Sequence, residues 1–507
     1  MRRNTVPVRV AVAALVVATA SIWLCAQNEA AGNHRRQLRY KLIDVGTFGG
    51  PTARGSGDFI GARILNDAGI ATGDADTSTP DPTCYNVDCF ISHVFRWQDG
   101  KLHDLGALPG SSNSSTASEI NERGEIAGLS SNGKIDLLTG ALETRAVLWT
   151  DGKVLDLGTL GGAESFATGI NDRGLVVGAS ANTVPDPFSM FGFGTETRTF
   201  VWENGRMRDI GTLGGPDAGP FAGPKRGRVI GNSYTNSNPN TDNGPFCAPN
   251  VPTQDPFLWE KGEMTDLGTL GGTCGFAKFI NNPGQVAGQS ALAGNRVSHP
   301  FLWDRGVLTD LGTLGGDNGD VSWMNDAGQI VGEADLRGSQ THDAFLWERG
   351  KMIDLGNLGQ TSFAFAINNR GQVVGHSLTN DGTFHAFLWE KGGPMIDLNV
   401  FVPSEGSSLA LLTDAFNVNE RGEIIGIGFP PGVPPGEVGS HVFLLIPCGD
   451  ESGNCRAGQI AMPSTESAAT VRPSSREARE ERPPTAMQRM LSRLRRTGFG
   501  KVIVQKY

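Results

Sequence analysis

The chain has 507 residues, of which 38% are hydrophobic and only 19% are charged, so it has enough apolar side chains for a core and too few charges for a coiled coil or a charge-driven disordered chain. No internal apolar run approaches the ~18 residues of a membrane-spanning helix, which excludes a polytopic membrane protein. Residues 1–36 carry a net charge of +4 and residues 472–507 carry +7, so the overall −10 leaves an acidic body near −21, and an acidic body without a basic stripe excludes nucleic acid as an expected partner.

The first 31 residues are expected to be an export signal. Arginines within the first nine residues precede an apolar stretch over Val10–Ala26, and small residues follow it. Two alternatives stay open: the segment is retained as an N-terminal anchor, or Cys25 carries a lipid. The predicted location is therefore secreted, periplasmic or cell-envelope, with no integral membrane domain after signal removal.

One phrase recurs in eight units along the middle of the chain. Each unit has an apolar strand that ends in tryptophan, a glycine turn, DLGTLGG or a variant of it, a variable stretch, IN..G.VVG and a second variable stretch. The tryptophans are Trp97, Trp149, Trp202, Trp259, Trp303, Trp347 and Trp389, and Leu445 takes this place in the last unit. The DLG-type aspartates are Asp44, Asp104, Asp156, Asp209, Asp266, Asp310, Asp354 and Asp397. The IN asparagines are Asn66, Asn121, Asn171, Asn281, Asn325, Asn368 and Asn419, with Pro224 instead in the degenerate fourth unit.

Each unit contains two hairpin signals. The segments AFLWERGKMIDLG and AINNRGQVVG are short apolar strands on either side of a glycine-containing turn. Two hairpins give four antiparallel strands in each unit, a sheet too small to bury its own faces. The sequence therefore predicts an all-β fold, a β-propeller of eight four-stranded antiparallel blades over residues 39–447. A β-solenoid is the competing architecture.

The two ends of the repeat region are complementary halves. Residues Arg39–Gly46 contain a DLG-type strand without its Trp-type partner, and His441–Ile446 is a Trp-type strand without its DLG partner. Pairing the two closes a ring and leaves no exposed strand edge, whereas a linear solenoid leaves both ends unfinished. We expect these two strands to pair in one blade.

The phrases HAFLWEKG, MIDLG, TLGG and INNRGQVVG resemble the HAF-repeat family of extracellular bacterial repeat proteins. The resemblance covers roughly residues 40–447, although the literal motif is intact only at His385-Ala386-Phe387. It implies secretion and a propeller-like array. It implies no activity, so no catalytic residue is carried over.

Six cysteines remain beside Cys25 of the export signal, and an exported protein can oxidise them. Proximity predicts the pairs Cys84–Cys89 and Cys448–Cys455, which leaves Cys247–Cys274 as the third. Sequence alone allows 15 pairings of six cysteines. A zinc site is the alternative, but the chain lacks the two-residue cysteine spacing that such sites use.

Signatures of enzyme chemistry are missing from the sequence. It has no Walker phosphate loop, nucleophile elbow, HExxH or dinucleotide fingerprint. Histidines recur near the start of the Trp strands, and we expect them to pack or hydrogen-bond rather than catalyse: His93, His299, His342, His385 and His441. The repeated aspartates and asparagines are expected to hydrogen-bond turn backbone within each blade. The fragment 315–320 faintly resembles a calcium-binding nonapeptide but occurs once, so no catalytic, cofactor or metal residue is predicted.

The connection between the VVG glycine and the Trp-strand aromatic varies in length. It has 23, 20, 23 and 27 residues in the first four units, against 14, 14, 13 and 18 in the others. Variable loops on a rigid scaffold are where binding sites are usually built. We therefore expect a binding scaffold for an extracellular glycan or protein, with the ligand on residues 74–92, 179–198 and 232–255. The alternatives are a propeller hydrolase or lyase acting on polysaccharide, and a purely structural envelope protein.

The C-terminal part of the chain is expected to lie outside the propeller. Residues 448–461 form a cysteine-containing segment, and residues 462–485 are rich in Ser, Pro, Glu and Arg, which predicts a disordered linker. Beyond it, Met487, Met490, Leu491 and Leu494 recur at helical spacing among arginines. Residues 486–507 are therefore expected to form a basic amphipathic helix and tail.

Overall fold

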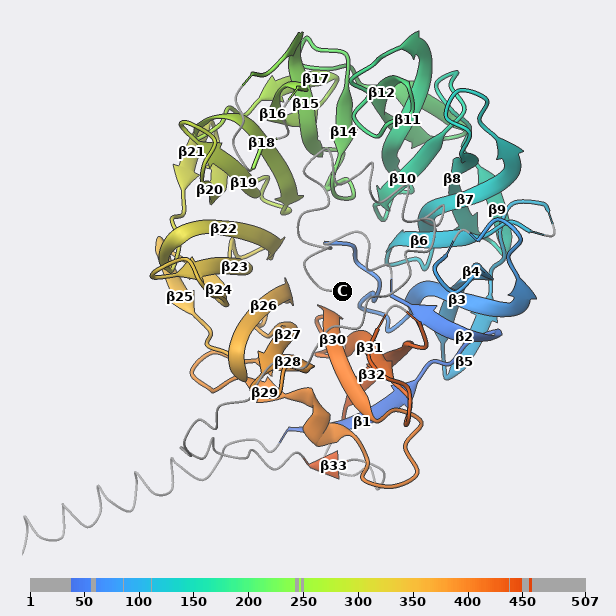
Figure 1. Ribbon diagram of the computed structural model, residues 1–507, viewed down its shortest axis with the longest axis vertical. Helices are drawn as coiled ribbons and strands as arrows, with labels where there is room; N and C mark the ends of the chain where they lie inside the picture. Colours follow the sequence, from blue (N-terminus) through green and yellow to red (C-terminus); the bar gives the residue numbers. More distant parts are fainter. Residues whose placement is uncertain are drawn as a thin grey trace, which may run out of the picture.

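The computed structural model describes residues 38–55, 61–84, 86–110, 112–241, 246–247, 250–436, 438–448 and 456–457. In these ranges the chain forms 33 strands and one short 3-10 helix, η1 (Leu398–Phe401), and no helix there is long and apolar enough to cross a membrane. The strands are arranged as a ring of small sheets around a central axis (Figure 1). The predicted export signal, linker and C-terminal helix lie outside the described residues.

The blades follow one another in chain order. Blade 1 contains β2 (Gly49–Arg54), β3 (Ala71–Pro80), β4 (Phe90–Gln98) and β5 (Lys101–Asp104). Blade 2 contains β6 (Ser115–Ile120), β7 (Ile126–Ile135), β8 (Leu142–Thr150) and β9 (Lys153–Asp156). Blade 3 contains β10 (Ser165–Ile170), β11 (Val176–Pro185), β12 (Thr195–Glu203) and β13 (Arg206–Asp209). Blade 4 contains β14 (Ala218–Pro220), β15 (Val229–Pro239), β16 (Pro252–Glu260) and β17 (Glu263–Asp266).

The second half of the ring repeats the pattern. Blade 5 contains β18 (Gly271–Ile280), β19 (Val286–Leu292), β20 (Ser298–Asp304) and β21 (Val307–Asp310). Blade 6 contains β22 (Gly315–Met324), β23 (Ile330–Leu336), β24 (His342–Glu348) and β25 (Lys351–Asp354). Blade 7 contains β26 (Gly359–Ile367), β27 (Val373–Thr379), β28 (Phe384–Trp389) and β29 (Ile396–Asp397). Blade 8 contains β30 (Leu411–Val418), β31 (Ile424–Phe429), β32 (His441–Pro447) and β1 (Arg39–Asp44), with β33 (Arg456–Ala457) on its outer edge.

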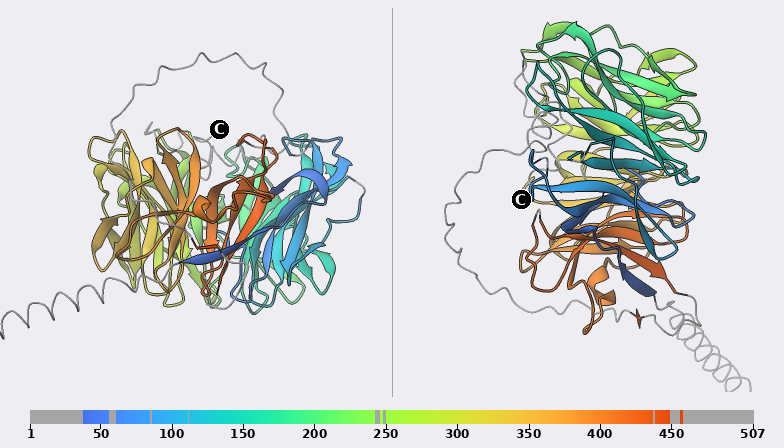
Figure 2. Two further views of the ribbon diagram at one scale, coloured as in Figure 1. Left: turned by 90° about the horizontal axis from the view of Figure 1, so that it is seen from below. Right: turned by 90° about the vertical axis from the view of Figure 1, so that its right-hand side faces the viewer.

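Each blade is an antiparallel sheet whose first strand lies nearest the ring axis and whose DLG strand lies on the outer side, where β33 adds one further strand in blade 8 (Figure 1). The strands run between the two faces of the disc (Figure 2). Blades 4 and 5 also touch through one parallel bridge, Gln254↔Cys274. The eight-bladed all-β fold expected from the repeat is confirmed for the described residues.

The ring closes as predicted. Strand β1 pairs antiparallel with β32, in the register Leu42↔Leu445 and Asp44↔Phe443. The backbone amide of Val45 extends the contact by donating to the carbonyl of Val442 at 2.9 Å. Blade 8 is thus built from both ends of the repeat region, and no blade is left with three strands.

The VVG glycine allows the core of each blade to pack closely. In blade 3, Gly178 pairs across the sheet with Phe200, which is fully buried. A Cβ at Gly178 would lie 2.1 Å from the carbonyl oxygen of Phe166 and 2.6 Å from the Phe200 ring, so only glycine fits. The same contact recurs between Gly426 and Phe443 in blade 8. The repeated glycine and the aromatic two residues before the tryptophan are therefore one packing unit.

Asparagines of the IN..G turns join neighbouring blades in a relay. Each side-chain amide donates to the backbone carbonyl of the next asparagine, at 2.9–3.3 Å, in the order Asn66–Asn121–Asn171 and Asn281–Asn325–Asn368–Asn419–Asn66. The relay is interrupted at blade 4, where Pro224 stands and Arg228 reaches the carbonyl of Asn282 at 3.5 Å instead. The predicted bonds within each turn are also present, but the link between blades was not foreseen.

Candidate functional site

The long insertions of the first four units lie in consecutive blades, 1 to 4. We name the surface that these insertions form the insertion face. The sequence suggested loops throughout, but only the tips are loops: the second and third strands of each blade continue into the insertion beyond a shift in strand register. The extensions end in the pairs Pro80↔Phe90, Ile135↔Leu142, Pro185↔Thr195 and Pro239↔Pro252. Blade 2 is built like its neighbours, although its insertion is not among the residues expected to bind the ligand, 74–92, 179–198 and 232–255.

The extended hairpins share one turn chemistry. Asp81, Asp136 and Asp186 stand at equivalent positions, and each carboxylate accepts the backbone amide two residues on, at 2.8–2.9 Å. All three are less than 10% exposed. The turn thus directs its carboxylate inward, and the residues on either side of it point toward solvent.

A small apolar core lies beneath the hairpin of blade 3. Met190, Phe191 and Phe193 are buried against Phe166 and Tyr234, and the ring centroids of Phe166 and Phe191 are 5.1 Å apart. The same cluster includes residues of blades 2 and 4. Apolar burial of this kind fixes the hairpin to the scaffold, because opening it would expose several aromatic rings.

Two carboxyl groups meet below this core. Asp217 accepts the backbone amide of Thr197 at 2.7 Å and that of Met190, and it is completely buried. Burial, followed by the nearby Asp186, raises the pKa of Asp217 to about 8. The Oδ2 atom of Asp186 is buried without another hydrogen-bond partner. Asp217 is therefore expected to hold a proton at neutral pH.

Blade 1 contains a second buried cluster, formed by one guanidinium and three carboxylates. Arg54 lies 2.9 Å from Asp76 and 3.7 Å from Asp74, and it also contacts Asp88 of the insertion. Burial raises the pKa of Asp76 to about 6, even though Arg54 opposes the shift. Thr52 donates to Asp88 at 2.8 Å, so the insertion is tied to the innermost strand β2.

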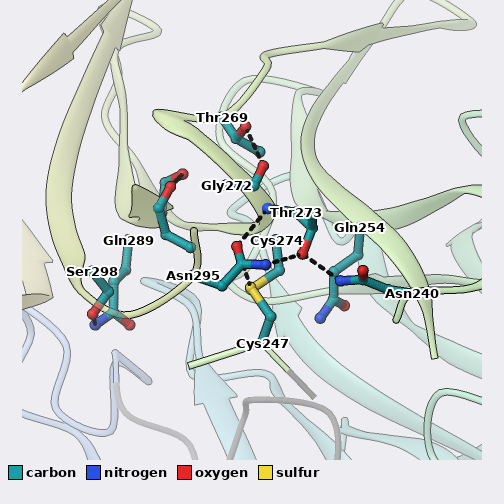
Figure 3. Close-up of a disulfide and its surroundings, with 12 residues drawn as sticks. Asn240, Cys247, Gln254, Thr269, Gly272, Thr273, Cys274, Gln289, Asn295 and Ser298 are labelled. Carbon is teal, nitrogen blue, oxygen red and sulfur yellow. Dashed lines mark hydrogen bonds between the residues drawn. A yellow bond between two sulfur atoms is a disulfide. The ribbon is translucent and has the colours of Figure 1, made fainter. Parts of the chain in front are cut away.

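Disulfides hold two of the four insertions, as predicted. Cys84 and Cys89 close a local bridge in blade 1, and Cys247 and Cys274 link the fourth insertion to β18 of blade 5. Around the second bridge, Asn295 accepts the amide of Thr273 at 2.8 Å and lies 3.4 Å from the sulfur of Cys247 (Figure 3). Cys448 is also disulfide-bonded, and its predicted partner, Cys455, lies outside the described residues.

The repeated histidines bind the DLG aspartates of their own blades. The Nδ1–carboxylate distances are 3.0 Å for His93–Asp104, 2.9 Å for His299–Asp310, 2.7 Å for His385–Asp397 and 3.0 Å for His441–Asp44. His342 stands one position earlier in its strand, and its Nε2 lies 3.2 Å from Glu333. Each DLG aspartate except Asp397 also accepts the amide of the glycine two residues on, so these groups stabilise the outer hairpin.

Four blades have another residue four positions before the tryptophan: blades 2 and 3 have Arg145 and Arg198, whereas blades 4 and 6 have an aspartate. The residue four before the tryptophan is Asp255 in blade 4 and Asp343 in blade 6, so a carboxylate faces the DLG aspartate. Burial and the neighbouring Asp266 raise the pKa of Asp255 to about 6. Asn357 compensates in blade 6, because its amide donates to both oxygens of Asp343 at 2.9 and 3.1 Å.

The fragment 315–320 is the start of strand β22, where Lys278 binds the carboxylate of Asp320 at 2.6 Å. Among the residues that the structure describes, no group of three or more His, Cys, Asp and Glu side chains is arranged to hold a metal ion. The two disulfides, the aromatic cluster, the Asp186–Asp217 pair and the Arg54 cluster each include residues of the insertions of blades 1, 3 or 4.

No family model and no curated protein matches the chain. Among solved structures it is similar to the acylaminoacyl peptidase of Pyrococcus horikoshii, at 11% identity and a TM-score of 0.38, over 72% of this chain and 56% of that one. It is also similar to an ulvan lyase bound to a saccharide, at 10% identity and a TM-score of 0.34, over 82% and 98% of the two chains. For the sialidase of Trypanosoma rangeli the values are 13% and 0.30, over 80% and 86%.

The chain therefore spans little more than half the length of the acylaminoacyl peptidase. At these scores the likenesses carry no weight for function. The assignment of the fold rests instead on the strand pairing and the ring closure.

Proposed function

We propose that the protein is an exported recognition propeller that binds an extracellular glycan or protein on its insertion face. The observation that carries this proposal is the asymmetry of the ring: four consecutive blades carry long hairpins, and the next four do not. Two disulfides, a buried aromatic cluster and buried carboxyl networks hold these hairpins in place. A preformed surface of this kind lowers the ordering cost of binding.

Export and membership of the HAF-repeat family are part of the same proposal. The disulfides support export, because such bonds persist in oxidising compartments. The family assignment rests on the repeated phrases of the sequence, and the histidine–aspartate contact in blades 1, 5, 7 and 8 gives the histidine of these phrases a structural role.

The test is a screen of the purified protein against bacterial and plant polysaccharides, read both by binding and by release of shorter products. Binding without product release supports recognition, and product release supports the alternative of a hydrolase or lyase. A ligand found in this way is then tested on a variant in which residues 77–89 are replaced by a two-residue glycine turn, with a matched replacement of the exposed turn 305–306 on the opposite side as control. Loss of binding only in the first variant, with both folded, supports the insertion face. Equal binding by both variants overturns blade 1 as part of the site.

A further inference from the structure

We propose that the tips of the hairpins of blades 2 and 3 dock onto a lipid membrane surface. The described residues include seven large apolar side chains that are exposed, and four of them lie on these two tips: Ile135, Leu137, Leu138 and Val184. We name these four residues the tip patch. This inference does not depend on the glycan or protein ligand proposed above.

The tips of the two hairpins touch at Leu138. A Cβ placed on Gly194, in the hairpin of blade 3, would lie 2.7 Å from a methyl group of Leu138. Leu138 therefore lies directly against the neighbouring hairpin. Leu137 projects beyond it and is 98% exposed. Single exposed leucines are common on protein surfaces, but these two lie where two hairpins meet.

The charges around the tip patch suit a bilayer. Asp136 and Asp186, the carboxylates within the two turns, are turned inward and buried. Glu143 at the base of the first tip accepts from Asn132 at 2.7 Å, and Glu196 at the base of the second contacts Arg198 at 2.6 Å. The exposed charge beside the leucines is Lys134. The acidic side chains of the two tips are therefore buried or paired, so no unpaired carboxylate has to lose its hydration when the leucines enter a bilayer.

The high exposure of Leu137 favours a lipid surface over a protein as the partner of the tip patch. A protein partner would need a pocket matched to a single projecting leucine, because the side chain of Leu137 has almost no neighbouring protein surface beside it. A bilayer adapts to a projecting side chain, and burying a leucine in it gains the full transfer free energy of that side chain. The rigid hairpins below the patch add no ordering cost.

The direct test places an environment-sensitive fluorophore on the tip. The full-length protein carrying Leu137→Cys is labelled with nitrobenzoxadiazole and mixed with vesicles of phosphatidylcholine, and then with vesicles that also contain phosphatidylglycerol. A blue shift and brightening are expected at position 137. The matched control is Val307→Cys, which is 63% exposed in the outer turn of blade 5 and should show neither. The label reports on its own site, so binding through other parts of the chain does not produce the signal.

The second arm measures partitioning of unlabelled protein into the same vesicles. The double variant Leu137→Asp/Leu138→Asp should lower the partition coefficient by at least about tenfold per leucine, with an unchanged melting temperature. Val307→Asp should leave it unchanged. The proposal is overturned if position 137 gives no shift or the same shift as position 307. It is also overturned if the shift appears without vesicles as the protein concentration rises, which would identify a second copy of the chain as the partner.

Discussion

Asn419 donates its side-chain amide to the backbone carbonyl of Asn66 at 3.0 Å, although 353 residues separate the two in sequence. The bond joins the last repeated turn to the first, so the relay continues across the closure of the ring. It lies at the junction between blade 8, which contains the closing strand β1, and blade 1. Ring closure therefore has two components, a strand pair at the outer edge and a buried amide near the axis.

The relay should contribute measurably to stability. Asn419→Ala removes the amide donated to Asn66 and the carbonyl that accepts the backbone amides of Arg421 and Glu423 at 3.0 Å. Because the site is buried, we expect a loss of about 2–4 kcal/mol in the free energy of unfolding, measured by urea denaturation. Asn380→Ala, at an exposed position, should change it by less than about 0.5 kcal/mol. Equal effects of the two variants would refute a special role for the relay.

Closure of the ring should matter far more than the C-terminal tail. Deletion of residues 39–46 removes β1, exposes the edge of β32 and removes Asp44, the carboxylate partner of His441. Deletion of residues 462–507 leaves every described strand in place. We expect a large fall in melting temperature, or aggregation, for the first variant only. If calorimetry gives the same melting temperature for both, the closing strand is not needed for stability.

The carboxyl pair in blade 3 should make stability fall with rising pH. Asp217 has a pKa of about 8 in the folded protein, against about 3.9 in an unfolded chain. Between these values the folded state holds a proton that the unfolded state has released, so this group's contribution to stability decreases as pH rises through that range. Asp186→Asn removes the neighbouring carboxylate and should make this decrease smaller, although burial keeps part of it.

Asp136→Asn provides the matched control for that variant. Asp136 occupies the same turn position in blade 2, but its free oxygen accepts from the hydroxyl of Thr139 at 2.7 Å rather than facing a carboxyl group. Its substitution should leave the dependence of the melting temperature on pH between 5 and 9 unchanged. A flattening of the same size in both variants would show that the turn, not the carboxyl pair, is responsible.

A histidine should be better than the native aspartate at position 255. Asp255→His restores in blade 4 the imidazole–carboxylate contact of blades 1, 5, 7 and 8 and removes the repulsion from Asp266 that contributes to the raised pKa. We expect an increase of about 1 kcal/mol or less in stability at pH 6, where the imidazole is largely protonated. The equivalent Asp343→His should gain less, because it breaks the two bonds from Asn357. Destabilisation by Asp255→His at pH 6 would contradict the assigned contact.

The two described disulfides should differ in what they contribute. Replacing Cys247 and Cys274 by serine opens a loop of 27 residues, and replacing Cys84 and Cys89 opens one of five. Chain entropy predicts losses of about 3.5 and about 2 kcal/mol respectively, measured by urea denaturation of the two double variants. A larger loss for the short bridge would mean that contacts around Asp88, rather than loop closure, dominate.

Much of the fold could be predicted because the repeat carries it. Eight phrases indicated eight blades, and the unmatched strands at Arg39–Gly46 and His441–Ile446 indicated the closure. Proximity indicated the disulfide Cys84–Cys89, and Cys247–Cys274 was the pair that remained. The relay between asparagines could not be predicted, because the distance between successive turns depends on how the blades pack.

The insertions were harder for a different reason. Their Pro, Thr, Asn and Asp residues are typical of loops, yet the flanking strands extend into the insertions before the hairpin turns. The pair formed by Asp186 and Asp217, like the contacts of Arg54, joins residues that lie in different segments of the chain. These residues lie outside the repeated phrases, so the sequence repeat carries no information about their contacts.

The pairing of β1 with β32 also sets a schedule for folding. Asp44 and His441 are 397 residues apart, so a chain that emerges from its N-terminus presents β1 as an unpaired edge until nearly all of the propeller has appeared. Contacts of such long sequence separation form slowly. The interval before the last blade assembles is thus when this protein is most exposed to aggregation and proteolysis, and a folding factor that shields Arg39–Asp44 would act there.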